Sequence, residues 1–78
     1  MISNLEYYKV FYYVATSGSI THAAKTLNVS QPAVSQSIKQ LEDSLNIQLF
    51  IRTAKGIHLT KEGQLLFTYV ESGYEKME

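Results

Sequence analysis

The sequence predicts a single, mainly α-helical domain that carries one small β-hairpin. Four segments repeat apolar residues at spacings of three and four, which is typical of helices. Brief breaks rich in serine, asparagine and glycine separate the first three of these segments. Two short apolar segments then flank a Lys-Gly tip, which is typical of a hairpin. A chain of 78 residues, 45% of them hydrophobic, is enough for one small domain.

The first helix is expected over residues 5–16, ended by Ser17-Gly18. Its apolar residues form two stripes, one of Leu5, Tyr8, Phe11 with Tyr12 and Ala15, and one of Tyr7, Val10 and Val14. A helix that is apolar on two sides is usually buried on both. We therefore expect the second stripe to pack against a later helix or a partner chain, and we assign it to a dimer interface.

The next two helices are joined by a very short connection. Ser19 can cap the first of them, whose inward residues are expected to be Ile20, Ala23, Ala24 and Leu27. Ser30 can cap the second, and Gln31-Pro32 fill its first turn, where the missing N–H of proline costs nothing. Its apolar stripe consists of Val34, Ile38, Leu41 and Leu45. This arrangement predicts a helix-turn-helix.

The remaining chain predicts a hairpin and a fourth helix. Residues 49–53 and 57–60 are the expected strands, and Thr60 can cap the helix that follows. That helix carries a seam at steps of four and three residues, made by Leu66, Val70, Gly73 and Met77, which is typical of a helix that pairs with another helix. The fold predicted for residues 1–60 is a winged helix-turn-helix with a three-helix core. Residues 61–78 are expected to begin a long linker and dimerisation helix, which we expect to continue in a longer protein because no capping signal precedes Glu78.

The polar face of the third helix carries the candidate DNA-reading residues. Glutamine can bond adenine through two hydrogen bonds, serine can bond several base edges, and lysine can reach guanine or phosphate. The amino-terminal part of such a helix lies closest to the bases in the major groove. The candidates for base reading are Gln31, Pro32, Ser35, Gln36 and Lys39. A solvated polar face is the alternative, but the helix-turn-helix before this face and the hairpin after it favour DNA reading.

A second set of residues is predicted to contact the DNA backbone, namely Ser19, Thr21, His22, Ser30, Arg52 and Lys55. Arg52 and Lys55, near the hairpin tip, can place cations on phosphates or in the minor groove. The hydroxyls and free N–H groups at the start of the second helix can hold a phosphate. The alternatives are helix capping alone for Ser19 and ordinary surface solubility for the hairpin cations.

The charge is unevenly distributed although the net charge is zero. Residues 20–61 carry five basic and two acidic residues, a net charge of +3, whereas residues 62–78 carry one basic and four acidic residues, a net charge of −3. This asymmetry suits a centre that faces DNA and a tail that points elsewhere.

Other classes of protein fit the sequence poorly. The chain has no cysteine, and its two histidines, His22 and His58, lie on different elements, so neither a metal nor another cofactor is predicted. No catalytic triad, phosphate loop or carboxylate pair in a recognisable setting is present, and we do not expect an enzyme. The first residues lack the basic region and the uninterrupted apolar stretch of a signal peptide, and no run reaches about 20 apolar residues. We therefore expect a cytoplasmic protein without membrane contact.

The sequence resembles the amino-terminal DNA-binding domain of LysR-type bacterial transcription regulators. The matching segments of the helix-turn-helix are residues 19–24, 27–35 and 38–42, and residues 49–52 and 59–63 resemble the hairpin and the start of the linker helix in that family. The resemblance implies a homodimer paired through linker helices, tetramers of the complete protein, and an operator with dyad symmetry on double-stranded DNA. It also implies a small-molecule effector that binds only to a carboxy-terminal domain.

The match departs from the family pattern at two positions. Many members carry arginine or lysine where this chain has Gln36, and a more basic second helix where it has His22. Fewer cations imply weaker non-specific attraction to DNA and a different base preference. Two functions remain open from the sequence: sequence-specific DNA binding as a homodimer, and a winged helix that serves as a protein-interaction module.

Overall fold

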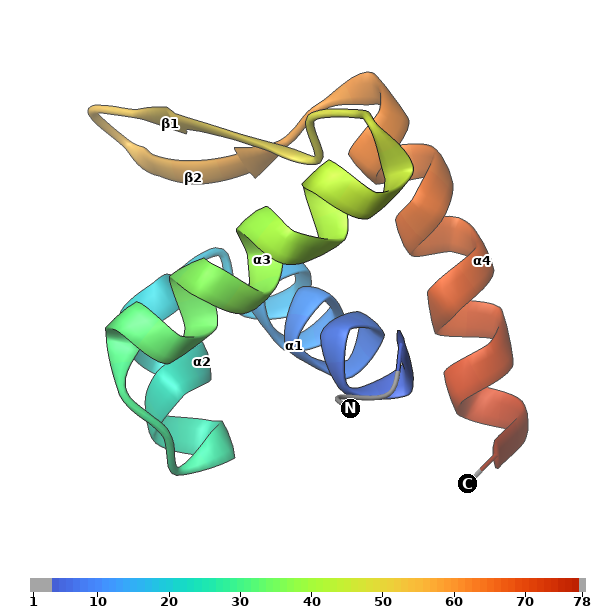
Figure 1. Ribbon diagram of the computed structural model, residues 1–78, viewed down its shortest axis with the longest axis horizontal. Coiled ribbons are helices and arrows are strands. Elements are labelled where there is room, and N and C mark those ends of the chain that lie inside the picture. The colour runs from blue at the N-terminus through green and yellow to red at the C-terminus, as the bar shows by residue number, and fades with distance from the viewer. Residues whose placement is uncertain (1–3, 78) are drawn as a thin grey trace.

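The computed structural model describes residues 4–77, and it describes the side chains of residues 5–73. The elements in chain order are α1 (Asn4–Ser17), α2 (Ile20–Leu27), α3 (Gln31–Leu45), β1 (Phe50–Thr53), β2 (Gly56–Leu59) and α4 (Lys61–Met77) (Figure 1). The predicted mainly helical fold, with a helix-turn-helix, a hairpin and a following helix, is confirmed.

Local hydrogen bonds fix both ends of α2 and the start of α3. The hydroxyls of Ser19 and Ser30 each accept a hydrogen bond from the backbone N–H three residues later, at 3.1 and 3.2 Å. Asn28 and Asn46 end α2 and α3 in the left-handed conformation, with φ of 59° and 57°. Asparagine tolerates this conformation better than most residues. Helix α3 therefore begins and ends at defined residues.

The core lies where α1, α2 and α3 meet the base of the hairpin. Its buried hydrophobic residues are Phe11, Val14, Ala23, Ala24, Val34, Ile38, Leu41, Leu49 and Phe50. The ring centroids of Phe11 and Phe50 lie 5.4 Å apart, which joins α1 to the first strand. Leu45, the last residue of the apolar stripe predicted for α3, lies in the last turn and is 37% exposed, so it is not part of this core.

The second apolar stripe of α1, made by Tyr7, Val10 and Val14, packs against later helices of this chain, which is one of its two predicted positions. Val14 was assigned to a dimer interface, but it is fully buried inside this chain, so that assignment is wrong. Tyr7 and Val10 are half-buried and pack against the same core. The stripe predicted for a partner or a later helix therefore packs mainly within the chain, because α2 and α3 both lie against α1.

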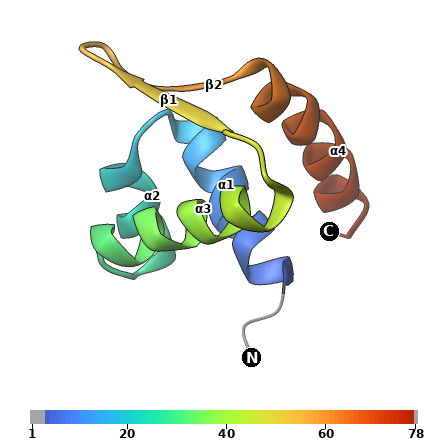
Figure 2. The same ribbon diagram turned by 45° about the horizontal axis from the view of Figure 1, so that its top comes forward.

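The hairpin is antiparallel and tight. Thr53 pairs with Gly56 across the turn, which leaves Ala54 and Lys55 as its two central residues. Gly56 has φ of 125°, a region that side chains rarely adopt. In Figures 1 and 2 the hairpin projects past α2 and α3, and its tip lies far from the end of α4. A narrow hairpin thus extends beside α3.

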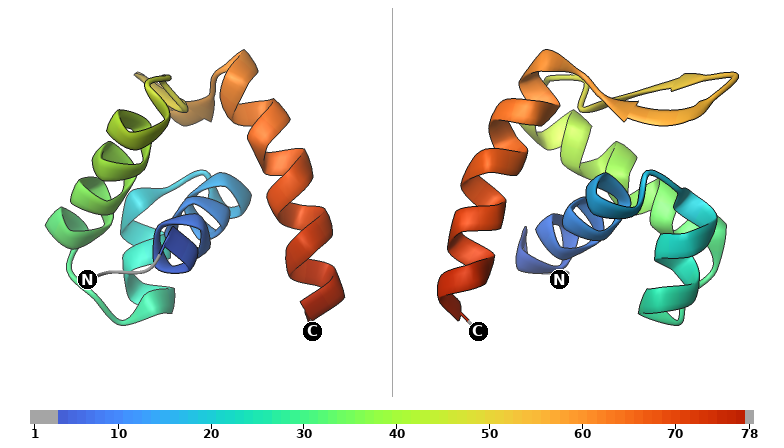
Figure 3. Two further views of the ribbon diagram at one scale, coloured as in Figure 1. Left: turned by 45° about the vertical axis from the view of Figure 1, so that its right-hand side comes forward. Right: turned by 180° about the vertical axis from the view of Figure 1, so that it is seen from behind.

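The start of α4 is joined to the base of the hairpin. The Thr60 hydroxyl accepts a hydrogen bond from the Gly63 N–H at 2.9 Å and donates one to the Gln48 carbonyl at 2.6 Å. Gly63 is buried, and a Cβ there would overlap the carbonyl oxygen of Leu49. From this joint α4 descends on the side of α1 away from α2, as both views of Figure 3 show.

Candidate nucleic-acid interface

A shallow polar hollow lies between α2, α3 and the hairpin. It has a volume of about 420 Å³. Its lining includes two residues from each of three elements: Ser19 and Thr21 at the start of α2, Gln31 and Ser35 on α3, and Arg52 and Thr53 on β1. Five of these six were predicted from sequence to contact DNA, and Thr53 was not. The fold thus brings predicted base-reading, phosphate-binding and hairpin residues onto one surface.

A second, smaller hollow of about 180 Å³ continues along α3. Ser35 and Arg52 line both hollows, and Lys39 and Glu42 line only the second. Lys39 also approaches Asp43, with Nζ 3.9 Å from Oδ2, in a pair whose side chains are 76% and 69% exposed. Such an exposed pair contributes little to stability, so the ammonium group of Lys39 is free to take another partner.

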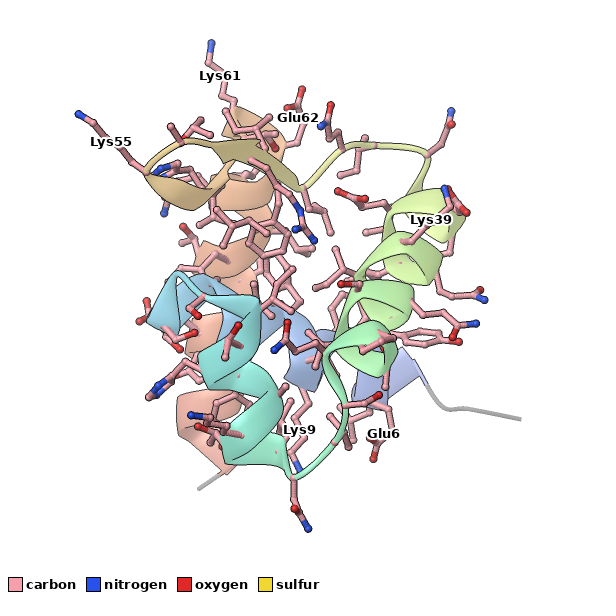
Figure 4. All side chains as sticks on the ribbon, turned by 90° about the vertical axis from the view of Figure 1, so that its left-hand side faces the viewer. Glu6, Lys9, Lys39, Lys55, Lys61 and Glu62 are labelled. Atoms are coloured by element: carbon pink, nitrogen blue, oxygen red, sulfur yellow. The ribbon has the colours of Figure 1, made fainter. Side chains whose placement is uncertain are left out.

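The other predicted contact residues lie around the hollows. Pro32, Gln36 and His22 are exposed on α3 and α2, and they do not belong to the lining of either hollow. Ser30 is exposed and uses its hydroxyl to cap α3. Lys55 lies in the hairpin turn and extends away from the body of the protein (Figure 4). Their roles on DNA stay predictions.

The charges on this face come from several elements. Figure 4 looks onto α2, α3 and the hairpin, with Lys55 and Lys61 extending outward at the hairpin end and Lys39 on α3. Glu62 lies beside Lys61 in the first turn of α4, where the positive end of the helix dipole stabilises its negative charge. Glu6 and Lys9 lie at the opposite end of the molecule. Cations therefore flank the polar hollow.

The geometry of this face suits a polyanion that exposes hydrogen-bonding groups, as the base edges of a nucleic acid do. The amino-terminal half of α3 is exposed, and an α-helix fits the major groove of B-DNA. Hydroxyls that accept a capping bond keep a hydrogen to donate, so Ser19 can cap α2 and still bond an anion. The amino end of α2 adds the positive end of a helix dipole. Hydroxyl, amide and guanidinium groups therefore converge beside one exposed helix.

A separate apolar groove runs between α1 and α4, and we call it the α1–α4 groove. It has a volume of about 570 Å³ and is lined by Leu5, Glu6, Tyr8, Lys9, Leu66, Tyr69, Val70 and Gly73. The rings of Tyr12 and Phe67 stack with centroids 5.8 Å apart and hold the two helices together. Leu5 and Tyr69 nevertheless remain 62% and 71% exposed.

Three predicted interface residues of α4 lie in this groove, namely Leu66, Val70 and Gly73. The side chain of Met77, the fourth predicted residue, lies outside the described residues. Sequence reasoning missed Tyr69 and assigned Leu5 and Tyr8 to the buried stripe of α1. Tyr7 and Val10 are not part of the groove lining, and their place in a dimer stays a prediction. The helical pattern of α1 could have signalled Leu5 and Tyr8 only if the position of α4 had been known.

Two features are absent from the described part of the chain. No group of three or more histidine, cysteine, aspartate or glutamate side chains there is placed to hold a metal ion. Among residues 4–77, no helix combines the length and apolar character that crossing a bilayer requires.

A three-helix core, an exposed third helix and a hairpin beside it define a winged helix-turn-helix domain. The profile of the "bacterial regulatory helix-turn-helix protein, lysR family" matches residues 5–64. The chain therefore belongs to the LysR family of bacterial regulatory helix-turn-helix proteins.

Similar proteins are transcription regulators rather than enzymes. The chain is 45% identical over 69 residues to the HTH-type transcriptional activator AmpR of Rhodobacter capsulatus, which covers 88% of this chain and 24% of AmpR. It is 46% identical over 68 residues to the HTH-type transcriptional regulator GltR of Bacillus subtilis, covering 87% of this chain and 23% of GltR. The chain thus spans about a quarter of the length of the curated relatives it matches.

The fold is also similar to a structure solved on DNA. In the crystal structure of the BenM DBD with catB site 1 DNA, the protein superposes with a TM-score of 0.89 at 32% identity. The match covers 94% of this chain and 82% of that one.

Proposed function

We propose that this chain is the promoter-recognition domain of a bacterial transcription regulator and that it binds double-stranded DNA sequence-specifically as a homodimer. The observation that carries the proposal is the polar hollow, where α2, α3 and β1 each contribute residues suited to a nucleic acid. The relatives named above and the BenM–DNA complex support it.

In this proposal α3 enters the major groove with its amino-terminal half against the bases. Gln31, Ser35 and Gln36 read base edges, and Lys39 reaches guanine or phosphate. Pro32, in the first turn of α3, packs against the base edges rather than bonding them.

The remaining residues contact the DNA backbone and do not recognise bases. Ser19 and Thr21 bond a phosphate at the amino end of α2, with His22 and Ser30 alongside, and Arg52 and Lys55 follow the backbone beyond the groove. Phosphate contacts fix the register of α3, and base contacts supply the specificity.

The dimer is proposed to form through the α1–α4 groove. Its exposed apolar lining, with Leu5 and Tyr69 more than half exposed, is the kind of surface that a second copy covers. A two-fold axis through paired α4 helices would place two copies of α3 on two half-sites of a dyad-symmetric operator.

We propose that this chain forms part of a longer protein, because the curated relatives are about four times its length. Residues 1–60 would form the DNA-binding domain, and residues 61–78 the start of a linker helix. A carboxy-terminal domain would bind a small-molecule effector, and the complete protein could assemble as a tetramer. Such a protein works in the cytoplasm, on the nucleoid.

The proposal is tested by selecting duplexes from a random pool with the purified chain. We expect one dyad-symmetric sequence to be enriched. Fluorescence anisotropy should then show tighter binding to that duplex than to a scrambled duplex of the same composition at moderate salt. Equal affinity for both duplexes would contradict the proposal and favour a protein-interaction module instead.

Two substitutions distinguish residues that recognise bases from residues that bind the DNA backbone. Gln36→Ala should lose discrimination at one base position in each half-site, by about 1–3 kcal/mol if its contact is bidentate. Arg52→Ala should weaken binding to every duplex and make the salt dependence less steep. If Gln36→Ala weakens all duplexes equally, α3 does not read bases in the way proposed.

A further inference from the structure

One carboxylate ties the recognition helix to the hairpin. Oε2 of Glu42, on α3, accepts a hydrogen bond from the Leu49 N–H at 2.7 Å and a second from the Phe50 N–H at 3.3 Å. We propose that Glu42 is a positioning residue that holds the hairpin beside α3 and thereby places Arg52 on the DNA backbone. The inference rests on the proposed function, because it assigns Glu42 a part in the same DNA contact.

The bonds of Glu42 lie at the point where the chain passes from α3 to β1. Leu49 is fully buried, so its N–H needs a partner inside the protein. The Leu49 carbonyl accepts a hydrogen bond from Thr60 at 2.9 Å, and the backbone carbonyl of Glu42 accepts one from Ile47 at 3.2 Å. The carboxylate is thus the side-chain link between α3 and the first residue of β1.

Because Arg52 lies on the same strand as Phe50, the position of Phe50 also determines the position of Arg52. Residues two apart on a strand point to the same face, so Arg52 lies on the face where Phe50 enters the core. Arg52 and Glu42 both line the small hollow on α3. Loosening the chain at Phe50 therefore moves Arg52 relative to the bases that α3 would read.

The charge of Glu42 makes the inference easy to test, because its two effects have opposite signs. A carboxylate beside a DNA-binding surface repels phosphate, so electrostatics alone predicts tighter binding when the charge is removed. A positioning role predicts weaker binding when the hydrogen bonds are removed. Both bonds go to a single oxygen, so the carbonyl of a glutamine can replace them without the charge.

The experiment compares Glu42→Ala with Glu42→Gln on the duplex selected by the wild-type chain. The matched control is Asp43→Ala, which removes one negative charge from the adjacent, exposed position on α3. Glu42→Ala should bind more weakly. The slope of log affinity against log salt should become less steep by about 1.8 for the dimer, which corresponds to one lost phosphate contact per subunit. Glu42→Gln and Asp43→Ala should bind as tightly as the wild type or more tightly.

The effect should also disappear when Arg52 is absent. Adding Glu42→Ala to Arg52→Ala should cause little further change in the salt slope, because both substitutions remove the same contact. Independent, additive effects on the slope would contradict the inference. So would Glu42→Ala binding as tightly as Asp43→Ala.

A measurement without DNA separates this inference from the proposed function. Hydrogen exchange at the cross-strand amides of the hairpin should accelerate by about tenfold or more in Glu42→Ala, the factor that a hydrogen bond to a charged group contributes. In Glu42→Ala, hydrogen exchange in α1 and the helical circular dichroism signal should both equal those of the wild type, which would show that the core is intact. Glu42→Gln should restore slow exchange in the hairpin. Unchanged hairpin exchange in Glu42→Ala would overturn the inference even if the chain binds DNA. If the wild-type chain has no preferred duplex, the proposed function fails instead.

Discussion

The surface formed by α2, α3 and the hairpin differs from the α1–α4 groove in how its shape is fixed. On the first surface, side-chain hydrogen bonds to backbone set the start of both helices and the base of the hairpin. In the groove, the two helices are held by packing such as the Tyr12–Phe67 stack, and large apolar side chains stay exposed. The polar surface is preorganised for a rigid ligand, whereas the apolar one gains stability only when something covers it.

The two surfaces are possible in so small a protein because α1 lies between them. Phe11 contacts Phe50 on one side and approaches Phe67 on the other, with centroids 5.4 and 6.5 Å apart. One helix therefore supports both the polar surface and the groove. Thr60 joins the base of the hairpin to the start of α4, and Figure 3 shows α4 descending from the hairpin on the far side of α1. Substitutions can be chosen that damage one surface or the joint between them.

The largest effect is expected at the joint. Gly63→Ala would drive a Cβ into the Leu49 carbonyl. The carbonyl is backbone and the Cβ is fixed to the backbone of α4, so rotating a side chain cannot relieve the strain. We expect a loss of about 3 kcal/mol in the free energy of unfolding, at the upper end for overpacking, measured by urea denaturation.

Gly73→Ala is the matched control, since the same methyl group on the same helix meets no atom within 4 Å. In the monomer, where no second copy covers the groove that Gly73 lines, it should stabilise α4 by about 0.5–1 kcal/mol in the same denaturation experiment. Equal stability of the two variants would mean that α4 does not pack against Leu49 in solution.

A large but selective effect is expected in the groove. Val70→Glu places a charge on the apolar lining and removes a side chain whose burial contributes about 1.5–3 kcal/mol. Dimerisation should weaken at least about tenfold, and analytical ultracentrifugation should show monomers.

Thr68→Glu adds the same charge to the same helix at an exposed residue that is not part of the groove lining. It should leave the sedimentation unchanged. If Val70→Glu sediments like the wild-type dimer, the two-fold axis does not pass through this groove.

The smallest effect is expected at the acidic end of the chain. Glu71 and Glu75 lie in the last turns of α4, which end far from the hairpin tip, and Glu78 lies outside the described residues (Figure 1). Replacing all three by glutamine should barely change DNA affinity, because charges beyond a Debye length of about 8–10 Å are largely screened.

The salt dependence provides the measurement. A dimer that engages two or three cations per subunit should show a slope of roughly −4 to −5 in log affinity against log salt, with and without the three glutamates. A severalfold gain in affinity from their removal would place α4 against the duplex and remove the distinction between the two surfaces.

The sequence by itself determined the order and type of the elements and the capped starts of α2, α3 and α4, whereas the predicted ends of the two strands differ by a residue from those observed. Ser19, Ser30 and Thr60 act on N–H groups three residues away, so each cap could be identified from neighbouring residues alone. The hairpin turn and the buried positions of α2 follow from equally short-range patterns. Five of the six polar-hollow residues named above could also be predicted, because the known geometry of a helix-turn-helix and a hairpin brings these local elements together.

Only the tertiary structure decided which faces are covered. The pattern of α1 shows two apolar sides, but it cannot show that Val14 is sealed by this chain while Leu5 stays exposed. The roles of Glu42 and Gly63 depend on Leu49, seven and fourteen residues away, on the far side of a loop. Contacts of this kind depend on how separate elements pack, and no helical or strand period encodes that packing.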